Sequence, residues 1–218
     1  KQSSTTFKIF LILHKFSEIA FRRCIRLKCS IMKKIIQVLQ SIAPLSEKDC
    51  DCVLEILTTT HLEKGQHWTE RGKKNDRVGF LEDGYLRKYY QNDGNEVTDF
   101  FYFENDFCAD LPSIIGNSLP HASIMAMQNT TLTTFSYHDF NELCKTSHSL
   151  EHLNRLIVEI TFLRFYKRSV SFVMQTPKER YDDLVITSPK TIQMATQYHI
   201  ASYLGIGPQH LSRLRAEK

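Results

Sequence analysis

The sequence predicts an α+β fold, in which an antiparallel, jelly-roll-like β-roll is followed by a long helix and a C-terminal helix-turn-helix. Three observations support this expectation. Short β-type runs separated by glycine turns fill residues 60–137, and residues 149–174 repeat apolar side chains at helical spacing. The chain then ends on two short helical patterns separated by LGIG. Closely spaced strands with turns between them are typical of a small antiparallel roll.

The composition is that of a globular protein that does not span a membrane. Of its 218 residues, 42% are hydrophobic and 24% are charged, and no apolar run reaches 18 residues. The net charge of +4 is uneven: residues 1–31 carry seven Lys or Arg and one acid, which leaves −2 for residues 32–218. Any contact with DNA must therefore be local.

The first segment does not resemble a secretory signal. Its apolar stretch FKIFLIL is short, is interrupted by Lys8 and precedes no small-residue cleavage site. Met32, followed by KKIIQVLQ, resembles a natural start. We expect residues 1–31 to be a non-native or disordered extension.

Six cysteines stand at positions 24, 29, 50, 52, 108 and 144. Their C-x4-C and C-x-C spacings match no common zinc pattern. Without a secretory signal, reduced thiols in a cytoplasmic protein are expected. An iron–sulfur site remains an alternative, and it would require four converging thiolates.

Two helical patterns precede the strands. KKIIQVLQSI repeats isoleucine and leucine at helical spacing. After Pro44, Ser46 is placed to cap a second helix, EKDCDCVLEIL. The acids Glu47 and Asp49 occupy its first turn, where the helix dipole favours them.

Glycine turns divide the predicted strands. YLRKYYQNDGNEVTDFFYF has the pattern of a β-hairpin turning at Asp93-Gly94. Gly65 and Gly84 also stand where a positive φ is expected.

The long helix carries more apolar surface than one small roll can cover. Its apolar stripe comprises Leu150, Leu153, Ile157, Ile160 and Leu163. Packing within one chain is the simpler explanation, but we favour a helix shared between two subunits, with a dimer formed through residues 148–175. Thr176-Pro177 then ends this helix and begins another, KERYDDLVI.

The C-terminal stretch TQYHIASYLGIGPQHLSRLR has the features of a helix-turn-helix. Thr196 caps the first helix, Gly205 supplies a left-handed C′ residue, and Pro208 starts the second helix. With Leu211 and Leu214 facing inward, four polar side chains point outward: Gln209, His210, Ser212 and Arg213. Because Arg pairs with guanine and Gln with adenine, this face is suited to DNA bases. A generic pair of packed helices remains the alternative.

These residues carry a family resemblance. RYDDL…YHIASYLGIGPQHLSRLR resembles the Crp–Fnr family of bacterial transcription regulators, especially Bacteroidetes-type members, and the resemblance runs from about Lys33 to Lys218. It implies a cytoplasmic homodimer that binds double-stranded DNA, and RNA polymerase is a possible partner. The implied domains are a cyclic-nucleotide-binding-like sensor (32–147), a dimerisation helix (148–175) and a winged helix-turn-helix (176–218).

The resemblance also implies the residues that contact DNA. Pro208, Gln209 and Arg213 fall on base-contacting positions of the family, and Thr196 to His199 fall on the helix that crosses the phosphate backbone. With the outward-facing side chains of the last helix added, the expected base-contacting set is Pro208, Gln209, His210, Ser212 and Arg213, and the expected phosphate-contacting set is Thr196, Tyr198, His199, Arg215 and Lys218. Two departures from the family pattern indicate a different operator. Gly207 replaces the usual Ser or Thr cap, and Pro208 stands where some members have a base-contacting Arg.

In cyclic-nucleotide-binding members, a stretch like FGEL is followed by an Arg; its Glu holds the ribose, and the Arg neutralises the cyclic phosphate. The corresponding segment here, FCADLPSIIGNSLPHASIMAM, places Asp110 at the Glu and Pro120 at the Arg. The expected effector pocket is therefore degenerate, with candidate residues Phe107, Asp110, Pro120, His121 and Ala122.

The wider neighbourhood of this segment is acidic. No Lys or Arg lies between Lys88 and Lys145, whereas eight Asp or Glu do. A buried phosphate without a paired cation is costly. Arg87, Arg155 or Arg164 could supply a cation, but only to a different pocket. We expect no control by cyclic AMP, no cofactor, and either another effector or none.

Two other functional classes remain to be weighed. One is a small-molecule-sensing module whose helix-turn-helix no longer binds DNA. The other is a cupin-like metal enzyme, which requires a His-x-His group with a carboxylate. His61 and His67 lack this grouping and no G-x-S-x-G motif is present, so an enzyme is not expected.

Overall fold

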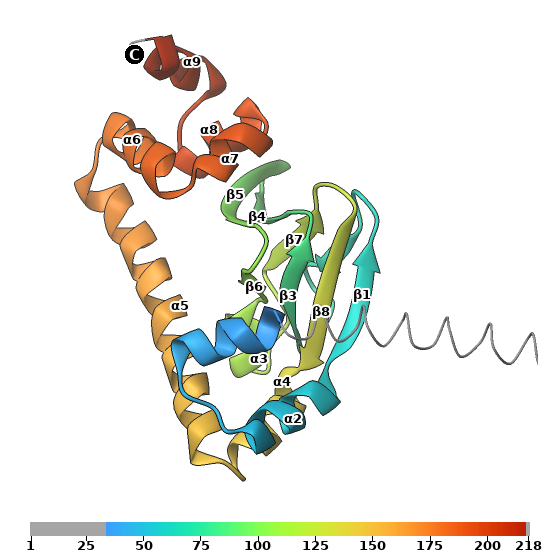
Figure 1. The fold of residues 1–218 in the computed structure, drawn as a ribbon. Helices are drawn as coiled ribbons and strands as arrows, with labels where there is room; N and C mark the ends of the chain where they lie inside the picture. Colours follow the sequence, from blue (N-terminus) through green and yellow to red (C-terminus); the bar gives the residue numbers. More distant parts are fainter. Residues whose placement is uncertain (1–33, 217–218) are drawn as a thin grey trace, which may run out of the picture.

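The computed structural model describes residues 34–216 (Figure 1). The expected extension over residues 1–31, the start at Met32 and the phosphate-contacting Lys218 all lie outside the described residues.

The predicted antiparallel roll is confirmed. One of its two four-stranded sheets has the order β1-β8-β3-β6 and the other has the order β2-β7-β4-β5. The strands are β1 (Thr58–Leu62), β2 (His67–Thr69), β3 (Arg77–Asp83), β4 (Leu86–Asn92), β5 (Asn95–Tyr102), β6 (Phe107–Cys108), β7 (Ala122–Ala126) and β8 (Thr130–Ser136). A buried core lies between the sheets and includes Trp68, Leu81, Leu86, Ile124 and Leu132.

Turn residues adopt the predicted backbone angles. Asp93 and Gly94 join β4 to β5 with φ values of 48° and 79°, which gives the two positive angles that a tight two-residue hairpin requires. Gly84 joins β3 to β4 at a φ of 99°. An added Cβ there would lie 2.8 Å from the Asn129 carbonyl oxygen, so this turn requires glycine for both angle and space.

Helices close one end of the roll. The helix over residues 34–42, α2 (Glu47–Ile56) and α4 (Tyr137–Cys144) share a core with the start of α5. Ser46 and Asp49 form the capping box of α2, so the predicted start is confirmed. The short helix α3 (Leu111–Ile115), between β6 and β7, was not predicted.

The long helix α5 (His148–Met174) runs along one side of the roll towards the C-terminal helices (Figure 1). Only the start of its apolar stripe is covered: Leu150 and Leu153 are buried, whereas Ile160 and Leu163 are 46% and 52% exposed. No helix in the described part of the chain is long and apolar enough to cross a membrane.

Four helices follow α5: α6 (Pro177–Thr187), α7 (Pro189–Met194), α8 (Gln197–Leu204) and α9 (Pro208–Ala216). They share a separate core of Tyr181, Leu184, Ile200, Ala201, Leu204, Leu211 and Leu214. The helix α7 was not predicted. Residues 177–216 contain no strand, so the wing implied by the family resemblance is absent from the described residues.

We predict that Gly84→Ala lowers the free energy of unfolding by about 2–4 kcal/mol, because the new Cβ meets backbone atoms at a positive φ. Gly94→Ala is the matched control: its φ is also positive, but nothing lies within 4 Å of an added Cβ. It should cost about 1–2 kcal/mol. Urea denaturation measures both changes, and equal losses would contradict the steric explanation.

Candidate functional site

The α8–α9 pair has the predicted local geometry. The Thr196 side chain caps α8 by accepting a hydrogen bond from the His199 backbone N–H. Gly205 ends the helix in the left-handed region at a φ of 70°. An added Cβ at Gly205 would lie 2.8 Å from the ring of Phe172 on α5, so glycine also permits the close approach of the two helices.

One face of α9 is exposed to solvent. Leu211 and Leu214 are buried in the helical core, as predicted. The five expected base-contacting residues are all exposed: Pro208, Gln209, His210, Ser212 and Arg213. Among the described residues, the side chains of Gln209 and Arg213 form no hydrogen bond or ion pair. This face therefore offers a guanidinium and a carboxamide to an external partner.

The expected phosphate-contacting residues divide into two groups. Thr196, Tyr198 and Arg215 are exposed, whereas His199 is half-buried on the side of α8 that faces the β4–β5 hairpin. Burial and the positive charge of Arg87 lower the pKa of His199, against an opposing effect of Glu96. His199 is thus uncharged at neutral pH, and in this arrangement it supplies no positive charge to a phosphate.

The β4–β5 hairpin holds α8 through Ser202. The Ser202 hydroxyl accepts a hydrogen bond from the Thr98 backbone N–H (2.9 Å) and donates one to the Glu96 carbonyl (3.1 Å). The ring of Tyr203 packs against Phe101 of β5, with centroids 5.7 Å apart.

Arg168 of α5 joins this contact from the other side. Its guanidinium donates to the carbonyls of Thr98 (3.2 Å) and Tyr203 (3.1 Å) and pairs with Asp99. It also lies 3.9 Å from the centroid of the Tyr203 ring. The β4–β5 hairpin, α5 and α8 therefore meet at the guanidinium of Arg168.

The expected effector pocket contains a buried ion pair. Lys88 is fully buried, and its Nζ lies 2.9 Å from Asp110 Oδ1 and 3.7 Å from Asp99 Oδ2. Burial alone lowers the pKa of Lys88, but the charge of Asp110, with a further contribution from Asp99, raises it above the ordinary value. Asp110, the residue expected at the ribose-contacting position, is thus already paired with a cation of the protein itself.

The sequence analysis missed Lys88. The available signal was the pair Arg87-Lys88 in a short β-strand: since side chains alternate along a strand, one of two adjacent cations must face inward. In the structure both are fully buried, and Arg87 pairs with Glu96.

The other candidate pocket residues do not form a cation-lined site. Pro120 and Ala122 are buried, and Phe107 packs on Phe80 with centroids 5.1 Å apart. His121 is exposed, and its side chain forms no hydrogen bond or ion pair with another described residue.

The arginines considered as substitute cations are also engaged. Arg155 pairs with Glu159 on the surface, and Arg164 pairs with Asp106 at 3.1 Å.

No metal site is formed among residues 34–216, where no cluster of three or more His, Cys, Asp or Glu could hold an ion. His61 is hydrogen-bonded to Thr131 and His67 to Tyr89, on different sheets.

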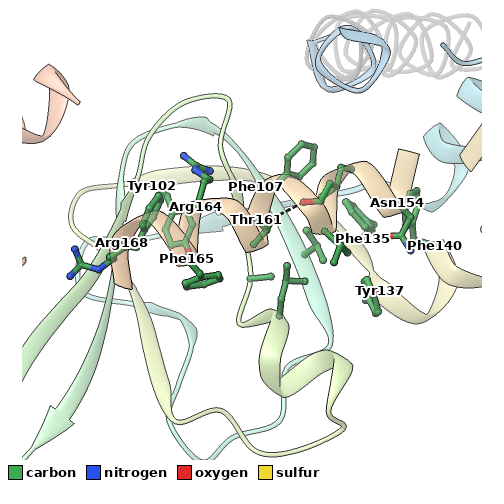
Figure 2. Close-up of a pocket in the computed structure, with 16 residues that line it drawn as sticks. Tyr102, Phe107, Phe135, Tyr137, Phe140, Asn154, Thr161, Arg164, Phe165 and Arg168 are labelled. Atoms are coloured by element: carbon green, nitrogen blue, oxygen red, sulfur yellow. Dashed lines mark hydrogen bonds between the residues drawn. The ribbon is translucent and has the colours of Figure 1, made fainter. Parts of the chain in front are cut away.

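An apolar cavity lies under α5. Figure 2 shows Tyr102, Phe107 and Phe135 of the roll beside Phe165 of α5, with Arg164 and Arg168 at one end.

Comparison with known proteins supports this description of the fold. Residues 59–147 match the family model of the cyclic nucleotide-binding domain. The chain has the fold of the Crp/Fnr regulators. FixK2 from Bradyrhizobium japonicum superimposes with a TM-score of 0.62 at 13% identity, covering 74% of this chain and 84% of that one. No curated protein matches the sequence.

Two further regulators have the same fold. A putative Crp/Fnr-family transcriptional regulator from Eubacterium rectale gives a TM-score of 0.62 at 18% identity, covering 79% of this chain and 83% of that one. The c-di-GMP-responsive global regulator CLP from Xanthomonas campestris gives 0.59 at 13% identity, covering 79% and 91%. These neighbours are regulatory proteins rather than enzymes.

We predict that Lys88→Met lowers the free energy of unfolding by about 3–5 kcal/mol, because it leaves Asp110 buried without its cation. The double variant Lys88→Met/Asp110→Asn should recover part of this loss, since it also removes the unpaired buried charge of Asp110. Chemical denaturation at pH 7 compares the three proteins. A double variant no more stable than Lys88→Met would contradict the pairing.

The same pair has a defined pH dependence. Because folding raises the pKa of Lys88, its stabilising effect is complete below the ordinary lysine pKa of about 10.4 and is lost as the pH rises through the higher folded value. The difference in stability between the wild type and Lys88→Met should therefore be constant from about pH 7 to 9 and shrink only in stronger alkali.

Proposed function

We propose that this protein is a homodimeric, sequence-specific DNA-binding transcriptional regulator of the Crp–Fnr type that is not controlled by cyclic AMP. The observation that carries the proposal is the exposed, unpartnered polar face of α9, presented from a helix whose other face is buried. Polar residues on a rigid helix, with no partner in their own chain, are suited to the major groove.

The proposed contacts follow from side-chain chemistry. Arg213 pairs with guanine and Gln209 with adenine, while Pro208, His210 and Ser212 border the same base edges. Thr196, Tyr198, Arg215 and Lys218 lie along the phosphate backbone. We give His199 a smaller part, because it is half-buried and uncharged in this arrangement.

The exposed side of α5 supports a dimer through residues 148–175. Leu163, Tyr166, Val170 and Val173 recur at the alternating three- and four-residue spacing of a coiled-coil seam. Along this seam Leu163, Tyr166 and Val173 are 52%, 57% and 80% exposed, which leaves a large apolar face for a second copy. A two-fold dimer would set two α9 helices about 34 Å apart, the spacing of successive major grooves.

The buried Lys88–Asp110 pair is the reason to exclude cyclic AMP. A nucleotide in the family's pocket would have to displace Lys88 from Asp110 and bring a phosphate to a site where Pro120 replaces the cation. We accordingly assign residues 32–147 to a sensor with a different effector or none, and residues 176–218 to DNA binding.

The contact between α8 and the sensor hairpin favours a second candidate, a signalling module in which the C-terminal helices bind protein instead of DNA. Ser202 and Tyr203 already join this unit to the sensor. Gel shifts over a range of salt separate the two functions. Phosphate contacts make DNA affinity fall steeply with salt, whereas a protein-binding module would show no DNA affinity at all.

We predict that Arg213→Ala weakens binding to the operator by about 10- to 100-fold and binding to scrambled DNA by less than about threefold, because a base contact carries the sequence preference. Fluorescence anisotropy measures both affinities, with and without cyclic AMP, which should change neither. Arg71→Ala, which removes a guanidinium on the roll, is the control. Equal losses on both DNAs would argue against a base contact.

We also predict that Tyr166→Glu converts a dimer into a monomer, because two carboxylates would meet in an apolar seam. Light scattering after size exclusion gives the mass of each protein. Ser118→Glu, which adds the same charge to an exposed position of the roll, should remain dimeric. A wild-type protein that is monomeric at micromolar concentration would refute the dimer.

A further inference from the structure

We propose that the inner side of α5 carries a binding site for a small organic anion with an apolar body, such as an alkyl or aryl carboxylate. The site shares Phe107 with the degenerate nucleotide pocket, but neither Asp110 nor His121 is among its wall residues. It combines two adjoining hollows, an apolar cavity and a cationic groove, which share Phe100, Arg164 and Arg168 as wall residues.

The cavity suits the apolar part of such a molecule. It encloses about 80 Å³ between α5 and the roll, with walls of aromatic and aliphatic side chains that include Phe135, Phe140, Ile157 and Phe165. Figure 2 shows the labelled aromatic rings gathered around this space, with the guanidinium groups of Arg164 and Arg168 at one end only. An apolar space of this size takes a chain of a few carbons or part of a ring.

The groove suits the charged part. It spans about 430 Å³ between α5, β5 and α6, and four cations line it, namely Arg164, Lys167, Arg168 and Arg180. Asp183 is its one acidic wall residue. The hydroxyl groups of Ser171 and Thr187 also line the groove, but each already donates its proton to a backbone carbonyl, that of Arg168 and Asp183 respectively. An anion is therefore the ligand charge that this groove favours.

Two of these cations lack a counter-ion within the described chain. Lys167 is exposed and forms no hydrogen bond or ion pair there. Arg180 donates only to backbone carbonyls, those of Gln175 and Leu204. Arg164 and Arg168 are paired with Asp106 and Asp99, which lie outside the groove wall. An anion in the groove would thus neutralise charge that the protein leaves unbalanced.

The position of the groove would allow a bound ligand to act on the end of α8, next to the turn into α9. Arg168 donates to the carbonyl of Tyr203 and Arg180 to that of Leu204, so both hold the last residues of α8, just before the Gly205 turn into α9. An anion that competes for these guanidinium groups would loosen the end of α8. This consequence rests on the proposed function, whereas binding itself does not.

The groove also remains open in a dimer. Arg164, Arg168 and Ser171 share one face of α5, because they are spaced by four and three residues. Leu163, Tyr166 and Val170 occupy a different face and would be covered by the second copy.

Isothermal titration of the full chain with octanoate tests the site directly. We expect saturable binding that is at least about tenfold weaker for octan-1-ol, which lacks the charge, and for acetate, which lacks the apolar body. Lys167→Gln should weaken octanoate binding by about tenfold. Val158 of α5 is a further wall residue of the cavity, and Val158→Phe should abolish binding by filling that space. Arg155→Gln, a cation removed from a different face of α5, should leave it unchanged.

Three results would overturn the site: no saturable octanoate binding, equal affinity for octan-1-ol, or equal effects of Lys167→Gln and Arg155→Gln. Lys167 is exposed, so its variant keeps the test valid even if Val158→Phe fails to fold. Operator affinity measured with and without octanoate then tests whether the bound anion alters DNA binding. If octanoate binds in calorimetry but operator affinity does not change, the site is supported and the effect of the ligand on DNA binding is refuted. If the protein does not bind DNA at all, the proposed function fails, but the calorimetric evidence for the site still stands.

Discussion

A buried chain of charges, Lys88–Asp110, Lys88–Asp99 and Asp99–Arg168, is the constraint on which the rest of the structure depends. Isolated charges are too costly to bury, so Lys88 and its two carboxylates must stay together. Their pairing fills the position where a cyclic nucleotide would need a free acid. Through Asp99 and Arg168 the same chain of charges fastens α5 to the roll.

The charge chain continues into the C-terminal helices. Arg168 reaches the carbonyl of Tyr203, and Ser202 bonds the β5 backbone, so the roll fixes α8 on one side only. The opposite side of this helical unit, with α9, stays free. Of the contacts that join the roll and α5 to α8, the one between Arg168 and Tyr203 lies in the wall of the groove described above.

Local signals in the sequence were sufficient for most elements. Ser46, Thr196, Gly205 and the Asp93-Gly94 turn each act within a few residues of themselves, so their roles could be predicted. The ion pairs of Lys88 could not, because its partners Asp99 and Asp110 become neighbours only after β4 pairs with β5 and β6 joins the other sheet. The partial burial of His199 was missed for the same reason: the hairpin that covers it lies about a hundred residues earlier in the chain.

Selection of bound fragments from random duplex DNA by the purified protein tests the central claim most directly. We expect enrichment of a near-palindrome whose two half-sites are centred about one helical turn apart, since a two-fold dimer would present α9 twice. Recovery of fragments with no common sequence, at the level of the starting pool, would contradict the claim that the exposed face of α9 contacts DNA bases.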